Sequence, residues 1–402
     1  MPKLVMLLIL VLGGISDLPA RAQYTLTTLA AFNGGPGSSS DGSLAVIGNT
    51  LYGTTVFGGA NSDGIVFSLP ITGGAETTIA TFNGNNGADV WAGLTAAGNT
   101  LYGTTFGGGN QGKGHGTVFS ITGGNLTTLA TFDGTAGYGP DGPVTVVGNT
   151  LYGTTSEGGS LGNYGTVFSM PITGGKITTL GTFAGTNGAS PWAGLAVVGN
   201  TLYGTTSVGG NLSVRSGVGG GTVFSVPING GAVTTLATFD GTDGAEPLTG
   251  LTVVGNTLYG TTEFGGDVDD GTIFSLPITG GTLSTLVSFN GTNGSEPSGL
   301  TVFGDSLYGT TTLGGGWGNM FSEPLTGGDP TTLFSFSPAA GSPSSGNLTL
   351  IGNTLYGTAT YPEITVFSLP VPEPTHMAPL MTAVVGILMR RHRQFKRSGV
   401  AL

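Results

Sequence analysis

Hydrophobic and polar positions along the chain repeat with a period of about fifty residues. The tetrapeptide Leu-Tyr-Gly-Thr occurs seven times, and successive copies are separated by 50, 50, 51, 56, 49 and 48 residues. A fixed period of this length is typical of solenoids, propellers and other repeat arrays. The seven tyrosines are Tyr52, Tyr102, Tyr152, Tyr203, Tyr259, Tyr308 and Tyr356.

Each repeat predicts four short β-strands, which we call strands A to D. The predicted segments are rich in β-branched and aromatic residues and are bounded by Gly, Asn or Pro. Gly-Asn between A and B fits a two-residue hairpin turn. Apolar residues on both faces of the strands indicate sheets that are buried on both sides. In the fifth repeat the four segments are Leu251–Val254, Leu258–Thr262, Thr272–Leu276 and Ser284–Phe289.

The order of the strands at the two ends of the repeat region predicts that the array closes into a ring. A lone D strand, Thr27–Phe32, precedes the first repeat, and the last repeat ends in a C strand, Val366–Leu369, without a D strand after it. Pairing of these two segments would leave no exposed edge. We therefore expect an all-β fold over residues 23–370, a seven-bladed β-propeller of four-stranded blades closed by its N- and C-terminal strands. The alternative, an open solenoid or paired sandwiches, would more often need atypical caps.

The first 22 residues differ from the repeats and predict a secretory signal. Lys3 supplies a positive charge, Leu4–Leu12 is apolar, and Ala-Arg-Ala at residues 20–22 fits a small-x-small cleavage site before Gln23. The alternative is a buried N-terminal strand or an anchor helix, for which the apolar run is short.

Residues 371–402 form a second distinct segment. Val-Pro-Glu-Pro at residues 371–374 is followed by an apolar run, Ala378–Met389, and then by a basic end. These features, in this order, resemble a PEP-CTERM sorting signal, the bacterial tail that exosortase-type membrane enzymes handle. The resemblance implies that the exosortase-type sorting machinery is a partner and that the protein has a cell-surface or extracellular location. The apolar run is shorter than the roughly twenty residues of a membrane span and contains Pro379, so we expect transient membrane association; an ordinary amphipathic helix is the alternative. The basic residues are Arg390, Arg391, Arg393, Lys396 and Arg397.

The repeat unit resembles the Gloeo/Verruco (GloVer) tandem repeat of exported bacterial proteins. The resemblance is carried by Gly-Asn-Thr-Leu-Tyr-Gly-Thr-Thr, a following Gly-Gly, and Gly-Thr-Val-Phe-Ser, over about residues 25–370. It implies an extracellular or surface location and brings no known catalytic residues. The double Gly after strand B is also similar, more weakly, to kelch blades.

The composition leaves few residues for catalysis. The chain has no Cys, which excludes disulfides and thiolate chemistry. His115 is the one His between Gln23 and Pro370, and it lies in a Gly-rich loop without a nucleophile elbow, so neither a Ser-His-Asp triad nor a His-based metal site is expected. The same span holds 19 acids against three cations, which would repel nucleic acid. We therefore expect no enzyme and no nucleic-acid partner. The three cations are Lys113, Lys176 and Arg215.

Strand parity places the connections at two ends of the fold. In a four-stranded antiparallel blade the A–B and C–D turns share one end, and the B–C and D–A loops share the other. The turns are short and uniform, whereas the loops vary, with a longer B–C loop around Arg215. Variable loops on a rigid scaffold carry function, so the loop end is the predicted binding face. All three Trp and 15 of the 19 acids fall in these loops, and the exceptions are Glu76, Asp305, Glu323 and Asp329.

Several residues of this face are candidates for ligand binding. Exposed Trp side chains can stack on sugar rings, although Trp91 and Trp192 occupy matching positions before Ala-Gly-Leu, which also fits a packing role. Two acidic clusters offer oxygen ligands for Ca²⁺, which is the one possible cofactor that the sequence indicates. Neither cluster matches an EF-hand loop. The alternative is that these acids only keep the long loops solvated. The ligand candidates are Trp91, Trp192, Trp317 and Arg215, and the two acidic clusters are Asp267, Asp269, Asp270 and Asp240, Asp243, Glu246.

The sequence predicts a non-catalytic protein of the cell surface or extracellular matrix that binds extracellular polysaccharide or surface proteins through its loops. Two alternatives stay open. One is a secreted carbohydrate-active enzyme, since glycosidases need only two carboxylates. The other is a passive structural spacer without a ligand.

Overall fold

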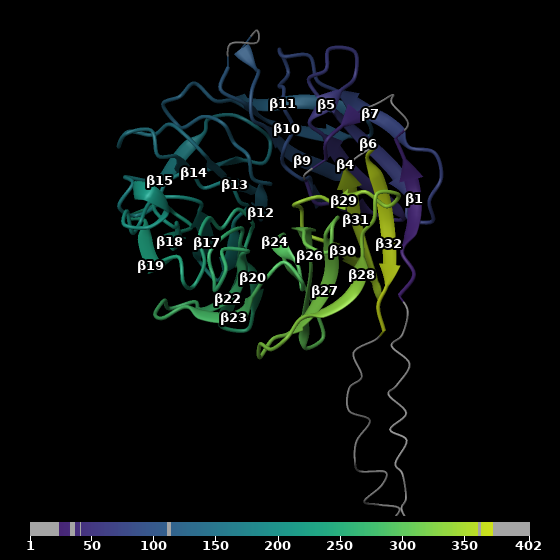
Figure 1. The fold of residues 1–402 in the computed structure, drawn as a ribbon. Helices are drawn as coiled ribbons and strands as arrows, with labels where there is room; N and C mark the ends of the chain where they lie inside the picture. Colours follow the sequence, from purple (N-terminus) through teal and green to yellow (C-terminus); the bar gives the residue numbers. More distant parts are fainter. Residues whose placement is uncertain (1–23, 33–36, 41, 111–113, 361–362, 373–402) are drawn as a thin grey trace, which may run out of the picture.

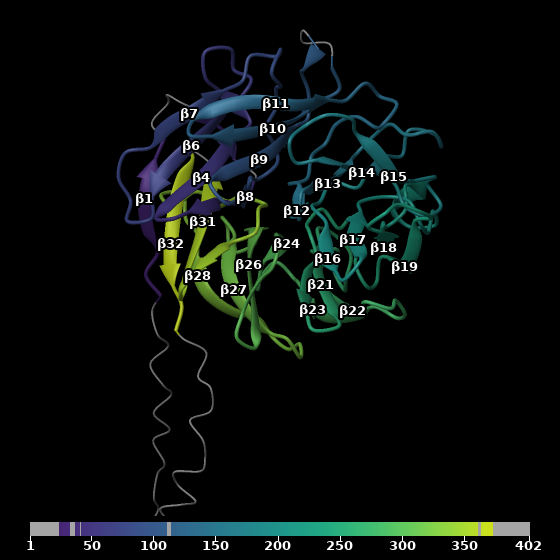
Figure 2. The same cartoon turned by 180° about the vertical axis from the view of Figure 1, so that it is seen from behind.

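Seven β-sheets stand around a central axis as the blades of a propeller in the computed structural model (Figures 1 and 2). The structure describes residues 24–32, 37–40, 42–110, 114–360 and 363–372. Each blade is an antiparallel sheet in the order A-B-C-D, and in three pairs of neighbouring blades the A strands contact one another. The expected seven-bladed propeller is therefore confirmed. The predicted signal at residues 1–22 and the tail from residue 373 onward lie outside the described residues.

Strands A and B form the inner half of each blade. Strand A has three residues, and strand B carries the Leu-Tyr-Gly-Thr motif. The A strands are β3 (Ala45–Ile47), β8 (Thr95–Ala97), β12 (Thr145–Val147), β16 (Ala196–Val198), β20 (Thr252–Val254), β25 (Thr301–Phe303) and β30 (Thr349–Ile351). The B strands are β4 (Thr50–Thr55), β9 (Thr100–Thr105), β13 (Thr150–Thr155), β17 (Thr201–Thr206), β21 (Thr257–Thr262), β26 (Ser306–Leu313) and β31 (Thr354–Thr360).

Strands C and D form the outer half, and four short strands lie in the loops. The C strands are β6 (Ile65–Pro70), β10 (Thr117–Thr122), β14 (Thr166–Pro171), β18 (Thr222–Pro227), β22 (Thr272–Pro277), β27 (Asn319–Pro324) and β32 (Thr365–Pro370). The D strands are β7 (Thr77–Thr81), β11 (Asn125–Thr131), β15 (Thr178–Thr182), β19 (Thr234–Thr238), β23 (Ser284–Ser288), β28 (Thr331–Ser335) and β1 (Thr27–Ala31). The loop strands are β2 (Gly37–Ser38), β5 (Phe57–Gly58), β24 (Ser295–Pro297) and β29 (Ser342–Pro343).

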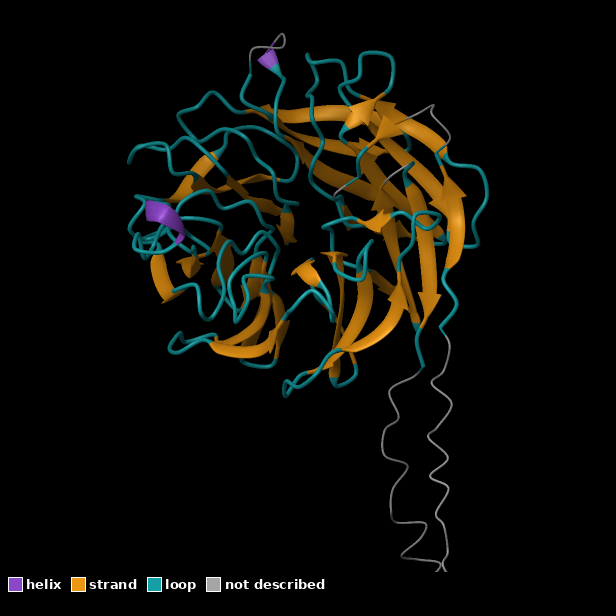
Figure 3. Ribbon diagram, in the orientation of Figure 1, coloured by secondary structure: helices purple, strands orange, loops and turns teal. Residues whose placement is uncertain are grey.

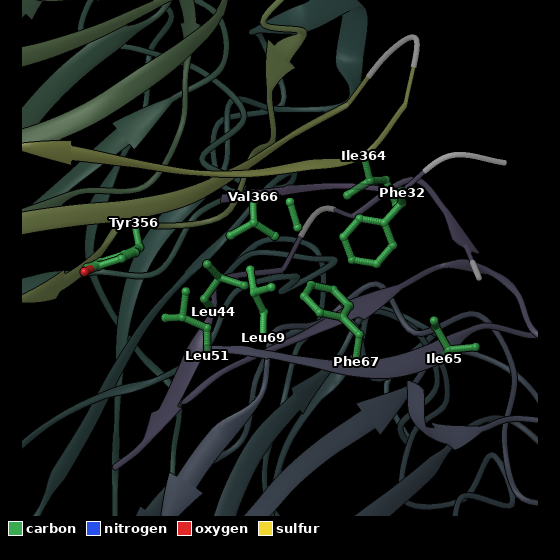
Figure 4. Packing of buried hydrophobic residues seen from close by; sticks show 10 residues of the cluster. Phe32, Leu44, Leu51, Ile65, Phe67, Leu69, Tyr356, Ile364 and Val366 are labelled. Carbon is green, nitrogen blue, oxygen red and sulfur yellow. The ribbon is translucent and has the colours of Figure 1, made fainter. Parts of the chain in front are cut away.

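The ring closes between the first and the last strand, as predicted. β1 pairs with β32 in antiparallel register, with Thr28 opposite Phe367 and Ala31 opposite Thr365. Across the seam, the Phe32 and Phe67 rings pack edge to face at 4.7 Å, within the cluster shown in Figure 4. The same D-strand to C-strand Phe contact joins the other blades, from Phe82–Phe119 to Phe336–Phe367. The closing seam therefore uses the packing of an ordinary blade interface.

The recurring tetrapeptide has a structural role at each of its four positions. In the first repeat Leu51 is fully buried, and Gly53 lies under the Phe67 ring, where an added Cβ would be 2.4 Å from Cζ. The Thr54 hydroxyl donates a hydrogen bond to the Ala92 carbonyl of the next blade at 3.0 Å. The Tyr is nearly buried in the other six copies and therefore has a packing role. The Tyr259 hydroxyl also donates a hydrogen bond to the Leu325 carbonyl at 3.5 Å.

The connections lie at two ends, and both described chain ends leave the fold at the turn end. In an antiparallel blade, the start of strand D and the end of strand C meet at the C–D turns, and Thr27 lies opposite Ser368 there. Val371 is buried and donates a hydrogen bond to the carbonyl of Asn353 in the last A–B turn. The propeller therefore includes Val371, one residue more than the predicted boundary at residue 370.

Candidate functional site

The exposed large apolar side chains of the described residues gather at one end of the propeller. All nine lie in the B–C or D–A loops or at a strand end that leads into them, and we call this end the loop face. In Figure 3 loops and turns are drawn in teal, and helices, such as the short η2 (Arg215–Gly217) of one B–C loop, in purple. Exposed apolar side chains that collect on one surface mark interaction sites more often than singly scattered ones do. The nine residues are Phe57, Trp91, Leu161, Tyr164, Trp192, Leu212, Val218, Val268 and Leu313.

A repeated backbone pattern holds the loop face in place. In six of the seven D–A loops the residue at one shared position has a left-handed backbone, for example Asp89 with a φ of 57°. Its N–H donates to Asp63 of the B–C loop in the same blade, and its carbonyl accepts from Phe106 in the next blade. This D–A loop is thus held between two B–C loops, which gives the variable side chains a rigid support. The other left-handed residues at this position are Ser39, Gly139, Ser190, Glu246 and Glu296.

The structure places the three predicted Trp residues in two environments. Trp91 and Trp192 are 39% and 46% exposed on the loop face, and Trp91 makes an edge contact with Phe57 at 6.4 Å. Trp317 is half-buried against the core between the last two blades. Trp91 and Trp192 are therefore open to solvent on the loop face, whereas Trp317 packs against the core.

Arg215 joins one acid from each predicted calcium cluster. Its Nε donates to Glu246 Oε1 at 2.8 Å, its Nη1 is 3.1 Å from Asp269 Oδ2, and its guanidinium lies 4.2 Å from the Phe264 ring centroid. Arg215 and Ser216, in the long B–C loop, both have a positive φ, of 52° and 56°. The structure thus brings Arg215, Glu246 and Asp269 together as a bridge between neighbouring loops.

The remaining acids of the two clusters have local partners. Asp240 accepts hydrogen bonds from the backbone N–H and the hydroxyl of Thr242, which lowers the pKa of Asp240. Asp243 accepts from the Asp240 N–H, and burial raises its pKa. The Asp267 N–H donates to Ser288, and Asp270 lies beside Gly291. Among the described residues, no three His, Asp or Glu side chains are placed to share one metal ion, so calcium binding stays a prediction for experiment.

Two further acids of the loop face have strongly raised pKa values. Burial, followed by the charges of Glu296 and Glu246, raises the pKa of Glu263 to about 7, although Arg215 opposes this. Burial and the charge of Glu157 raise the pKa of Asp141 to about 7, and a hydrogen bond with Ser156 opposes this. Neither acid stands out in the sequence, because their protonation depends on loops that meet only in the folded ring.

A cluster of polar and aromatic side chains, which was not predicted from the sequence, joins the second and third blades. We call it the blade 2–3 cluster, and it consists of His115, Tyr138, Glu157 and Asn163, with Tyr164 next to Asn163 in the chain. Tyr138 donates to Glu157 Oε2, and the Asn163 amide donates to the same oxygen at 3.2 Å and to the Tyr138 hydroxyl at 3.3 Å. The His115 and Tyr138 rings are 5.0 Å apart. A comparison of repeats could have found the cluster, since Tyr138 stands where Ala88, Ala189 and Ala245 form the same bridge.

The described part of the chain also contains an open groove of about 500 Å³. It is lined by the end of β11, the D–A loop that follows, and the C–D turn and D strand of the third blade, including Asp133 and Lys176. No helix among the described residues is long and apolar enough to cross a membrane.

The comparisons with known proteins find one repeat family and a widely shared fold. A family model described as the Gloeobacter/Verrucomicrobia repeat matches residues 13–217 and 212–369. No curated protein matches the chain. A puromycin-hydrolysing peptidase from Mycobacterium tuberculosis is 12% identical over 84% of this chain and 50% of its own, with a TM-score of 0.50. BamB from Moraxella catarrhalis is 14% identical over 85% of each chain, with a TM-score of 0.47. At these identities the likeness to solved structures shows the fold alone.

Proposed function

The chain belongs to the Gloeobacter/Verrucomicrobia repeat family, and from this premise we propose that it is an exported, non-catalytic protein that binds extracellular partners through its loop face. One observation carries the proposal: the nine exposed large apolar side chains of the described residues all lie on that face. Such a surface costs solubility unless a partner covers it.

The position of the chain ends supports this arrangement. Both described ends leave the propeller at the turn end, opposite the loop face. If the segment beyond residue 372 tethers the protein to sorting machinery or a membrane, the loop face points away from the tether. A surface-bound disc would then offer its variable loops to polysaccharide or to neighbouring proteins.

The binding proposal is tested by probing arrays of glycans and extracellular proteins with the full chain. The proposal is supported if the chain binds one class of glycan or protein and the Trp91→Ala or Trp192→Ala variant does not, because both indoles are exposed on the loop face. Blank arrays, together with a melting temperature that is the same in CaCl₂ and in EDTA, would instead support a passive spacer. Export is tested separately by locating the full chain in cell fractions of the producing organism.

One pair of acids favours a second candidate function, a carbohydrate-active enzyme. Asp141, with a pKa of about 7, is influenced by the charge of Glu157, and a protonated acid beside a carboxylate is the arrangement that glycosidases use. Release of reducing ends from polysaccharide by the full chain, abolished by Asp141→Asn, would establish this function. Release that persists in Asp141→Asn would assign the activity to other residues.

A further inference from the structure

The blade 2–3 cluster and the adjoining Tyr164 expose aromatic and polar side chains to solvent. Tyr164 is 39% exposed, His115 and Asn163 are also exposed, and Tyr138 and Glu157 are half-exposed. The hydrogen bonds from Tyr138 and Asn163 both reach Glu157 Oε2. Oε1 of this carboxylate has no hydrogen bond to another described residue, so it can accept one from a ligand.

Glycines of the neighbouring loops support the two exposed rings. An added Cβ on Gly185 would lie 3.3 Å from the Tyr164 ring, and one on Gly134 would lie 3.6 Å from the His115 ring. His115 and Tyr164 occupy equivalent positions, since the carbonyl of each accepts a hydrogen bond from the left-handed residue of the D–A loop, Gly139 or Ser190. The repeat thus sets rings on adjacent blades, with the polar network between them.

The network fixes the polar side chains before any ligand arrives. The Asn163 Oδ1 accepts a hydrogen bond from the Gly158 N–H at 2.7 Å, so both ends of this amide are held. The bond to Glu157 raises the pKa of the Tyr138 hydroxyl, which therefore stays protonated at neutral pH. Side chains that are already ordered lose little entropy on binding.

We propose that the blade 2–3 cluster is a binding site for the pyranose rings of a neutral oligosaccharide. The aromatic rings cover the apolar C–H face of the sugar, while Glu157 Oε1 and the second lone pair of Asn163 Oδ1 accept hydrogen bonds from its hydroxyl groups. The ligand is neutral because residues 23–370 hold 19 acids against three cations, a net negative charge that would repel uronates or sulfated sugars. The inference rests on the proposed function and names its ligand class and site.

Calorimetric titration of the full chain tests the inference. The probes are neutral gluco-, manno-, galacto- and xylo-hexaoses, with an alginate hexamer as the anionic counterpart. We expect at least one neutral hexaose to bind and the alginate to bind more weakly. Tyr164→Ala and Asn163→Ala should each weaken binding about tenfold. Ser160→Ala, which changes an exposed side chain of the same loop outside the cluster, should stay within about twofold of wild type.

Other outcomes separate this inference from the function on which it rests. If Tyr164→Ala and Asn163→Ala fold, as judged by an unchanged melting temperature, and bind the hexaose like wild type, the site is elsewhere. If hexaose binding is lost in Trp91→Ala or Trp192→Ala in that case, the inference is overturned and the proposed function still stands. If no neutral hexaose binds, the inference fails, and a protein captured on the arrays would still support the proposed function.

Discussion

At the residue scale, the fold depends on glycines, which have no side chain, as much as on the buried apolar residues. The Gly of each Leu-Tyr-Gly-Thr lies beneath the Phe ring of the adjacent C strand, and in all seven copies an added Cβ would approach that ring within 2.7 Å. Real Cβ atoms do not come this close, so a larger residue must displace a fully buried ring. The conservation of the tetrapeptide between repeats therefore follows from packing.

The substitution Gly103→Ala tests this explanation. Its Cβ would lie 2.5 Å from Phe119 Cζ, and overpacking of this kind costs about 1–3 kcal/mol. Denaturant unfolding should show that loss. Gly98→Asn is the matched control, because Gly98 has a φ of 60° in a turn with nothing near its Cβ, and Asn tolerates that conformation. An equal loss in both variants would refute the packing explanation.

Glu323 makes the stability of the propeller depend on pH. It is fully buried on β27, where the other C strands carry an apolar residue such as Leu276, and neither carboxylate oxygen has a hydrogen-bond partner. Burial and the charge of Asp329 raise its pKa from 4.5 to about 7. The folded state then holds the proton more tightly than the unfolded state, so stability is lost as the pH rises through this interval.

The variant Glu323→Gln removes this titration. A shift of this size corresponds to about 3 kcal/mol at most, so the variant should gain up to that amount over wild type between pH 4 and pH 8. Urea unfolding at the two pH values measures the change. Asp329→Asn, at an exposed position nearby, serves as the control and should show a much smaller pH effect. If the difference in unfolding free energy between Glu323→Gln and wild type does not change with pH, the raised pKa assigned to Glu323 is wrong.

At the element scale, the ring closes through an interface equivalent to the other six. The Thr349 hydroxyl donates to the Leu44 carbonyl across the seam at 2.7 Å, as Thr252 does to Leu300 between two internal blades at 2.6 Å. Strand β1 therefore completes the seventh blade, so the sheet array has no open edge at this point.

A designed disulfide tests the closure, and the chain has no native Cys to confuse the result. Ala31→Cys with Thr365→Cys places two thiols at paired positions of β1 and β32. We expect the bond to form and to stabilise the protein by about 2–4 kcal/mol. Peptide mapping and thermal unfolding check both points. The pair Ala31→Cys with Thr331→Cys, on strands that do not pair, should form no intramolecular bond; a bond there, or none between residues 31 and 365, would contradict the register.

The repeats allowed the strands and the closure to be predicted, but not the polar clusters of the loops. The sequence of Thr27–Phe32 is similar to the D strands of the repeats, and strand pairing follows the repeat. Its partner, the last C strand, could therefore be predicted from the sequence. The contacts of Arg215 with Glu246 and Asp269 join loops of different repeats, and they depend on a positive φ at Arg215 that composition does not reveal. Tyr138 and Glu323 could have been noticed, since each interrupts a repeated apolar position.

At the scale of the whole molecule, the propeller separates a uniform face from a variable one. The turn face carries short repeated hairpins and both described chain ends, whereas the loop face carries the exposed aromatic side chains and the raised-pKa acids Asp141 and Glu263. This division lets seven similar blades keep one scaffold while their loops differ, as in other proteins that place function on loops.

Binding of the labelled full chain to the extracellular matrix of the producing organism tests the separation of faces most directly. The loop-face variant carries Trp91→Ser and Trp192→Ser, and the matched turn-face variant carries Asn125→Ser and Lys176→Ser at exposed turn positions. With melting temperatures unchanged, the account predicts that the loop-face variant loses at least 90% of the bound protein, about 1.4 kcal/mol, and that the turn-face variant binds like wild type. Equal binding by both variants, or loss confined to the turn-face variant, would contradict it.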